Sequence, residues 1–171
     1  GNSTQPALSA DGAHVAFVST ATNLAGGVGL PQVFVRDLSA NNNEVVSRGD
    51  GGAMAVPAAT SPSISADGRL VAFASAADNL GESGVVADAQ RQPPVAGSDV
   101  FVRDVAWEET ILMSRQSGAG GAPMERDSAA PALSPGGSLV AFVSDMKVGE
   151  EPPPEEGGLP TDILRPTVFA R

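Results

Sequence analysis

Short apolar runs separated by Gly, Asp, Asn and Pro dominate the pattern of this chain. The runs are rich in Val, Phe, Ile and Leu, and none continues at the three-to-four-residue spacing of an amphipathic helix. Runs such as 70–74 are apolar at consecutive positions, which is expected of strands whose two faces are both covered. The pattern therefore predicts an all-β protein whose sheets pack between neighbouring sheets.

One order of motifs recurs three times, with a period of roughly 55 to 70 residues. Each copy has a Pro-x-Leu/Ile-Ser segment, then a turn, a Val-Ala-Phe strand and a later strand that ends in Arg. The copies begin at Pro6, Pro62 and Pro131. A fixed order at a regular period is typical of repeat architectures, so the fold is predicted from the repeat.

Two hairpins are expected in each repeat. In the first repeat, Asp11 and Gly12 separate two apolar runs, and a tight turn with positive φ at its central residues favours an Asp-Gly pair. The strand at 33–36 is followed by a polar turn and a further strand at 44–48. Four antiparallel strands per repeat are typical of a β-propeller blade.

The repeats predict blades at 5–48, 61–115 and 130–171, with the third lacking its last strand, so that about 2.75 blades are present. Closed propellers have about four to eight blades, which predicts a partial ring here. We expect missing propeller blades or other protein subunits to cover the open strand edges. Association of copies of this chain through those edges is the alternative.

The segments at 62–75 and 99–104 resemble the WD40-like (PD40) repeats of the TolB-like family. The resemblance recurs in all three repeats and implies a β-propeller in the bacterial periplasm or outside the cell. It also implies a binding or scaffolding role, or an accessory domain of a peptidase or lyase whose catalytic domain lies outside this chain.

Composition narrows the classes of partner. The net charge is −10 with a single lysine, Lys147, which disfavours binding to nucleic acid. No run of about twenty apolar residues is present, so no transmembrane segment is expected. Tyrosine is absent and Trp107 is the one tryptophan, which makes carbohydrate binding the weaker alternative.

Functional residues are expected where the repeats differ, because positions shared by every blade serve the blade itself. The connections at 76–98 and 145–166 are longer than the equivalent connection at 21–32. Trp107, near the tip of a turn, is expected either to cover a neighbouring blade or to anchor a partner. The residues proposed for partner binding are Glu82, Asp88, Arg91, Trp107, Glu150, Glu151, Glu155 and Glu156.

No catalytic residue, cofactor or metal ion is predicted. The one histidine, His14, is expected at the exposed start of a strand, and no Gly-x-Ser-x-Gly motif accompanies it. The resemblance also implies a calcium-binding pattern in some related repeats, of which this chain has only the pair at 78–79 and Asp99; these do not form a contiguous ligand loop. The sequence thus favours a non-catalytic propeller that binds protein or serves as a structural subunit.

Overall fold

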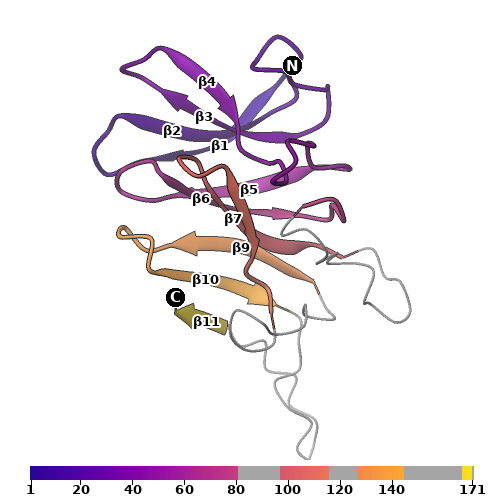
Figure 1. Cartoon of the computed structure of the whole chain (residues 1–171), viewed down its shortest axis with the longest axis vertical. Helices are drawn as coiled ribbons and strands as arrows, with labels where there is room; N and C mark the ends of the chain where they lie inside the picture. The colour runs from indigo at the N-terminus through magenta and orange to yellow at the C-terminus, as the bar shows by residue number, and fades with distance from the viewer. Residues whose placement is uncertain (81–96, 116–126, 145–166, 171) are drawn as a thin grey trace, which may run out of the picture.

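The computed structural model describes residues 1–80, 97–115, 127–144 and 167–170, which contain β-strands and no helix. Each sheet is antiparallel and follows the order of the chain, as Figure 1 shows. The predicted all-β fold, built from propeller blades in a partial ring, is confirmed. The first sheet contains β1 (Ser3–Leu8), β2 (His14–Ser19), β3 (Gln32–Asp37) and β4 (Asn42–Val45); the second contains β5 (Ala59–Ile64), β6 (Leu70–Ser75), β7 (Asp99–Asp104) and β8 (Glu109–Leu112); the described strands of the third are β9 (Ser128–Leu133), β10 (Leu139–Ser144) and β11 (Thr167–Ala170).

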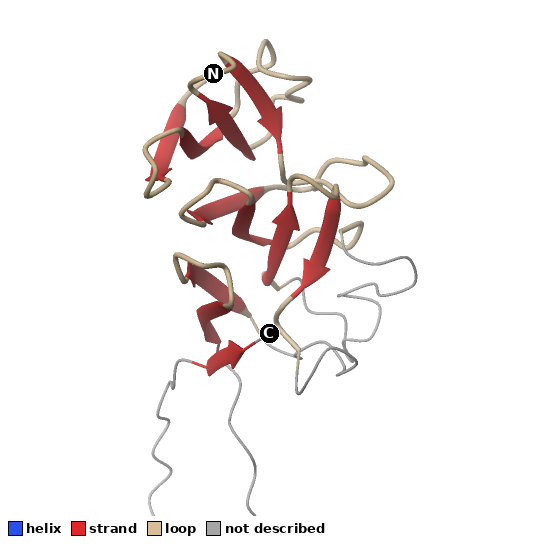
Figure 2. Ribbon diagram, turned by 60° about the vertical axis from the view of Figure 1, so that its left-hand side comes forward, coloured by secondary structure: helices blue, strands red, loops and turns tan. Residues whose placement is uncertain are grey.

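The three sheets follow one another as successive blades, face against face (Figure 2). The first strand of each sheet packs against the preceding sheet, so that β5 contacts β1, β2 and β3, and β9 contacts β5, β6 and β7. The same backbone hydrogen bond joins each pair of blades. Ala59 N–H donates to the Pro31 carbonyl at 2.9 Å, and Ser128 N–H donates to the Ser98 carbonyl at 2.6 Å.

The turn between the first two strands of each blade differs from the sequence expectation. Gly12 has φ of 69°, but Asp11 is not in the left-handed region, so the expectation of positive φ at both central residues is wrong. Gly12 N–H donates to the Ser9 carbonyl at 3.0 Å, which closes a four-residue turn with glycine in its last position. Asp11 instead serves the turn through its carboxylate, which accepts the Ser9 hydroxyl and the Ala13 N–H.

These turns also bond to one another across the blades. Asp11 N–H donates to the Ala66 carbonyl at 3.0 Å, and Ala66 N–H donates to the Pro135 carbonyl at 2.8 Å. Because the turn fixes where each strand begins, these bonds set the position of one sheet relative to the next.

The first strands share a second irregularity. The residues before the three motif prolines, Gln5, Ser61 and Ala130, have φ of 53°, 55° and 49°. The pairing between the first and second strands shifts register at the same places, as expected of a β-bulge. Ser61 N–H donates to Gln5 Oε1 at 2.7 Å, so the first two bulges are linked directly.

Aromatic pairs occupy the centre of the first two blades. Phe73 stacks on Phe101 with ring centroids 5.8 Å apart, and Phe17 stacks on Phe34 at 5.7 Å. Phe73 is completely buried, whereas Phe17 in the first blade is half-buried. The difference follows from position, because the second sheet has a described neighbour on both faces.

We expect Phe73→Ala to lower the free energy of unfolding by about 3–5 kcal/mol, because it leaves a cavity between packed sheets. Phe17→Ala is the matched control at the same position of the first repeat, and we expect a smaller loss because Phe17 is half-buried. Urea unfolding followed by circular dichroism measures both. Equal losses would contradict the packing described here.

Candidate functional site

In the first two blades, the turn between the last two strands is held by an arginine at the end of the third strand. Arg36 donates to the backbone and side-chain oxygens of Asn41, and Arg103 donates to the Glu108 carbonyl and to Thr110 Oγ1. Asn41 and Glu108 have φ of 55° and 57°. Both arginines thus bond within their own blade, in line with the expectation that positions shared by the repeats serve the blade itself.

In the second blade this turn fixes Trp107. Asp104 Oδ1 accepts the backbone N–H groups of Ala106 and Trp107, both at 3.0 Å. Arg69 donates through Nε and Nη2 to the Asp104 carboxylate, with the shortest distance 2.8 Å. The Arg69 guanidinium also lies over the Trp107 ring, 5.0 Å from its centroid, in cation–π geometry. The indole is therefore positioned by its surroundings, although 74% of it is exposed.

The Asp104 carboxylate is ionised in this setting. Burial by itself would raise the pKa of Asp104, but the hydrogen bonds from Arg69 and from the Trp107 N–H favour the charged form. Together with the positive charge of Arg69, these bonds hold the pKa of Asp104 below its usual value of 3.8. At neutral pH, Arg69 and Asp104 thus form an ion pair beneath the indole.

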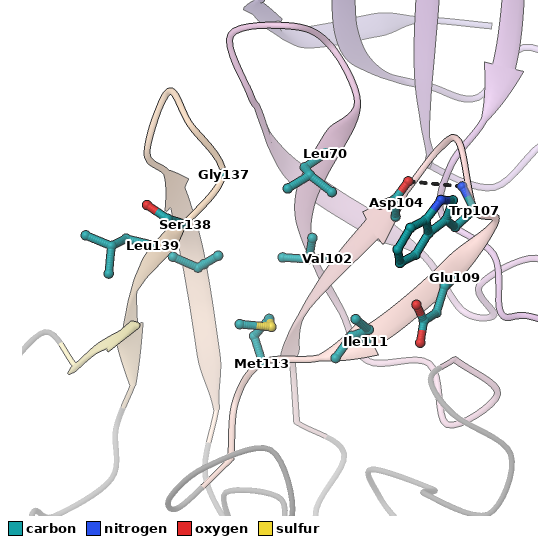
Figure 3. A pocket seen from close by; sticks show the side chains of 11 residues that line it. Leu70, Val102, Asp104, Trp107, Glu109, Ile111, Met113, Gly137, Ser138 and Leu139 are labelled. Atoms are coloured by element: carbon teal, nitrogen blue, oxygen red, sulfur yellow. Dashed lines mark hydrogen bonds between the residues drawn. The ribbon is translucent and has the colours of Figure 1, made fainter. Parts of the chain in front are cut away.

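A groove of about 320 Å³ lies beside Trp107, between the second and third sheets (Figure 3). Its floor and walls are mainly apolar, and its polar lining consists chiefly of two carboxylates and one hydroxyl. The second sheet contributes Leu70, Val102, Asp104, Trp107, Glu109, Ile111 and Met113, and the third contributes Gly137, Ser138, Leu139 and Val140.

The equivalent groove between the first and second sheets has about 280 Å³ and a different lining. Its walls carry several ionisable side chains: His14, Asp37, Glu44, Asp67 and Arg69. Val105 and Ala106 of the second sheet also line it. The two grooves occupy the same place in the repeat, so their lining residues can be compared one by one.

The comparison shows that several ionisable positions of the first groove are apolar or neutral in the second, whereas Asp37 keeps a carboxylate counterpart in Asp104. His14 corresponds to Leu70, Glu44 to Ile111, and Arg69 to Ser138. Trp107 stands where the first repeat has Ala40. The groove beside Trp107 has therefore departed from the common blade pattern toward an apolar surface with an aromatic side chain at its mouth.

Of the residues predicted for partner binding, the structure describes Trp107 alone. It places Trp107 at the groove mouth, against Arg69 of its own blade. Glu82, Asp88, Arg91, Glu150, Glu151, Glu155 and Glu156 lie outside the described residues. Sequence reasoning missed Leu70, Ile111 and Leu139 because they belong to ordinary strand segments. The replacement of Glu44 by Ile111 at one position of the repeat was the signal that could have found them.

The residues considered for catalysis and metal binding have structural contacts. His14 lies 3.8 Å from Asp11 and 3.9 Å from Asp37. The Asp99 carboxylate accepts the Ser114 hydroxyl at 2.7 Å, and the Asn79 amide donates to the Met54 carbonyl. Within the described ranges, no group of three or more His, Cys, Asp or Glu side chains is arranged to hold a metal ion.

None of the described segments forms a helix long and apolar enough to cross a membrane.

Neither a protein-family model nor a curated protein sequence matches this chain. Solved structures do match it. Putative TolB from Agrobacterium tumefaciens is similar over 84% of this chain, with 17% identity and a TM-score of 0.50. The tricorn protease is similar over 99% of this chain, with 13% identity and a TM-score of 0.53. TolB from Acinetobacter baumannii matches over 84% of this chain, with 20% identity and a TM-score of 0.48.

These matches cover only part of the larger proteins. The chain spans 38% of the Agrobacterium protein, 27% of the Acinetobacter protein and 14% of the tricorn protease. At this level of identity, the similarity shows a shared fold. The chain thus has a β-propeller fold of the kind found in TolB and in the propellers of related proteins.

We expect Asp104→Asn to lower the free energy of unfolding by about 1–2 kcal/mol at neutral pH, because the partly buried hydrogen bonds from Arg69 lose their charged acceptor. The loss is modest because the Arg69 side chain is 43% exposed and water screens the pair. The pKa of Asp104 is lower in the folded chain than the value of 3.8 expected when the chain is unfolded. The ionised carboxylate therefore stabilises the fold at pH values above 3.8, and this contribution is lost as the pH falls below that value.

The difference between wild type and Asp104→Asn should therefore shrink as the pH falls below about 4. Urea unfolding at neutral pH and at a series of acidic pH values measures this. Asp78→Asn, at an exposed position, is the control. A difference that stays constant from neutral to strongly acidic pH would contradict the role assigned to the Asp104 charge.

Proposed function

We propose that this chain is a non-catalytic segment of a β-propeller that binds protein through the groove beside Trp107. The observation that carries the proposal is the exposed indole, fixed by Arg69 and Asp104 at the mouth of an apolar groove. Tryptophan is enriched among the residues that contribute most to protein interfaces. A rigid aromatic side chain also loses little conformational entropy when a partner binds.

The comparison between repeats supports this assignment. A blade does not require tryptophan at this turn, since the first repeat has Ala40 there. The hydrogen bonds that fold the turn are present in both blades, because Asp37 accepts the N–H groups of Ser39 and Ala40 just as Asp104 accepts those of Ala106 and Trp107. Trp107 thus adds an exposed apolar surface without serving the turn itself.

We place this segment in a larger propeller or assembly of the bacterial periplasm or cell exterior. The likeness to a putative TolB, of which this chain spans 38%, supports a larger ring. Missing blades or other protein subunits would then cover the outer faces of the first and third sheets. Exposed apolar side chains on the described sheets, including Leu8 and Val143, fit such contacts.

An accessory propeller of a hydrolase is the second candidate. The likeness to the tricorn protease, whose name denotes a peptidase, supports it. In that case the reaction would take place in a catalytic domain beyond these residues, and this chain would present or admit the substrate. A catalytic motif elsewhere in the full-length protein would favour this candidate over the scaffold.

Selection of short random peptides displayed on phage, against the immobilised chain, tests the protein-binding function. We expect the wild type to enrich a set of related peptides and Trp107→Ala to bind them at least about tenfold more weakly, as expected for an interface hot spot. Leu38→Ala is the matched control, because Leu38 is an exposed apolar residue next to the equivalent turn of the first blade. Failure to enrich any peptide, or equal binding by Trp107→Ala, would contradict the proposal.

A further inference from the structure

We propose that the groove beside Trp107 binds an extended segment of a partner protein that places a large apolar side chain next to a lysine or arginine. This inference rests on the proposed function and specifies the chemistry of the partner. Three observations support this inference: the size and apolar lining of the groove, the sign of the charge in the groove, and the net charge of the whole chain.

The size and lining of the groove suit a short segment. At about 320 Å³ the groove is near the lower end of the range of about 300–1,000 Å³ found for binding pockets. Leu70 and Ile111 line one side and Leu139 lines the other, as Figure 3 shows, with the Trp107 ring close to Asp104 and Glu109. An aliphatic or aromatic side chain that enters this space exchanges water for apolar contact on both sides.

The negative charge of the groove favours a lysine or arginine of the partner next to the apolar side chain that enters the groove. The ionisable lining residues are Asp104 and Glu109. Asp104 is paired with Arg69, but among the described residues no cation lies within ion-pair distance of Glu109. The equivalent groove has Asn42 in place of Glu109, and its wall has Arg69 where this groove has Ser138. Relative to the first groove, this groove gains Glu109 and lacks the counterparts of Glu44 and Arg69, so that its ionisable lining consists of two carboxylates and no cation.

The net charge of the chain argues against a second copy as the occupant. The chain carries 20 acidic and 10 basic residues, with a net charge of −10 and one lysine. The sequence at 150–156, with four glutamates, has the same sign as the groove. Copies of this chain repel one another at neutral pH, whereas a basic segment of another protein is attracted.

Trp107 is also the reporter for the test, since the chain has one tryptophan and no tyrosine. The probe is a capped synthetic peptide, Gly-Ser-Lys-Leu-Lys-Phe-Lys-Ser-Gly, and the comparison peptide has glutamate in place of each lysine. We expect the basic peptide to change the intensity and wavelength of the Trp107 emission in a saturable manner. The acidic peptide should not change them, and added salt should weaken the binding of the basic peptide.

Two variants test whether the peptide binds in the groove and whether the charge of the groove selects it. Ile111→Ser removes part of the apolar lining without changing the charge, and Glu109→Lys reverses the charge at that position. We expect each variant to weaken binding of the basic peptide by about tenfold or more, and Glu109→Lys to gain affinity for the acidic peptide. Val28→Ala, at a position that is 50% exposed and outside the groove, is the control that should leave binding unchanged. Circular dichroism checks that each variant is folded.

Each alternative result overturns the inference. Equal affinity for both peptides, or unchanged affinity of Glu109→Lys, would show that charge does not select the ligand. Unchanged affinity of Ile111→Ser would place the binding outside the groove. If the basic peptide fails to bind while peptides selected by display do bind in a Trp107-dependent manner, the partner chemistry is wrong and the protein-binding function stands. If neither binds, the proposed function fails as well.

Discussion

The fold depends on the burial of both faces of each sheet. Phe73, Phe101 and the strand residues around them are buried because a neighbouring sheet covers each side of the second blade. A sheet with two apolar faces is not stable alone in water, so each blade requires the next. The backbone bonds from turn to turn, through Asp11, Ala66 and Pro135, then fix the relative position of sheets that apolar contact alone would hold less specifically.

The same constraint explains what the sequence could predict. Repetition of the motifs and the continuous apolar runs were sufficient for the strands, their antiparallel order and the propeller fold. The turn conformation was harder, because an Asp-Gly pair fits both a two-residue turn and the observed turn, in which Gly12 alone has positive φ. That choice depends on the Ser9 hydroxyl, which bonds to both the Asp11 carboxylate and the His14 backbone.

The candidate site was predicted only at Trp107, since an exposed tryptophan in a variable turn is visible in a sequence. The groove itself was not predicted, because Leu70 and Leu139 belong to different blades and are ordinary strand residues until the sheets pack. Ile111 is recognised as a change in the groove lining only when it is compared with Glu44 at the same position of the repeat. In a repeat protein, shared positions describe the scaffold, and departures from the repeat locate the surface on which a specific function can be built.

The proline in the third turn limits the hydrogen bonds that this turn can make to a neighbouring blade. Ala66 both accepts a hydrogen bond from the first turn and donates one to the third, so it acts as a relay between neighbours. Pro135 stands at the same position of the repeat and accepts the bond from Ala66, but it has no backbone N–H to donate. A bond from the third turn to a sheet packed beyond it would therefore need another donor, such as the N–H of Gly136, which stands where the first repeat has the donor Asp11.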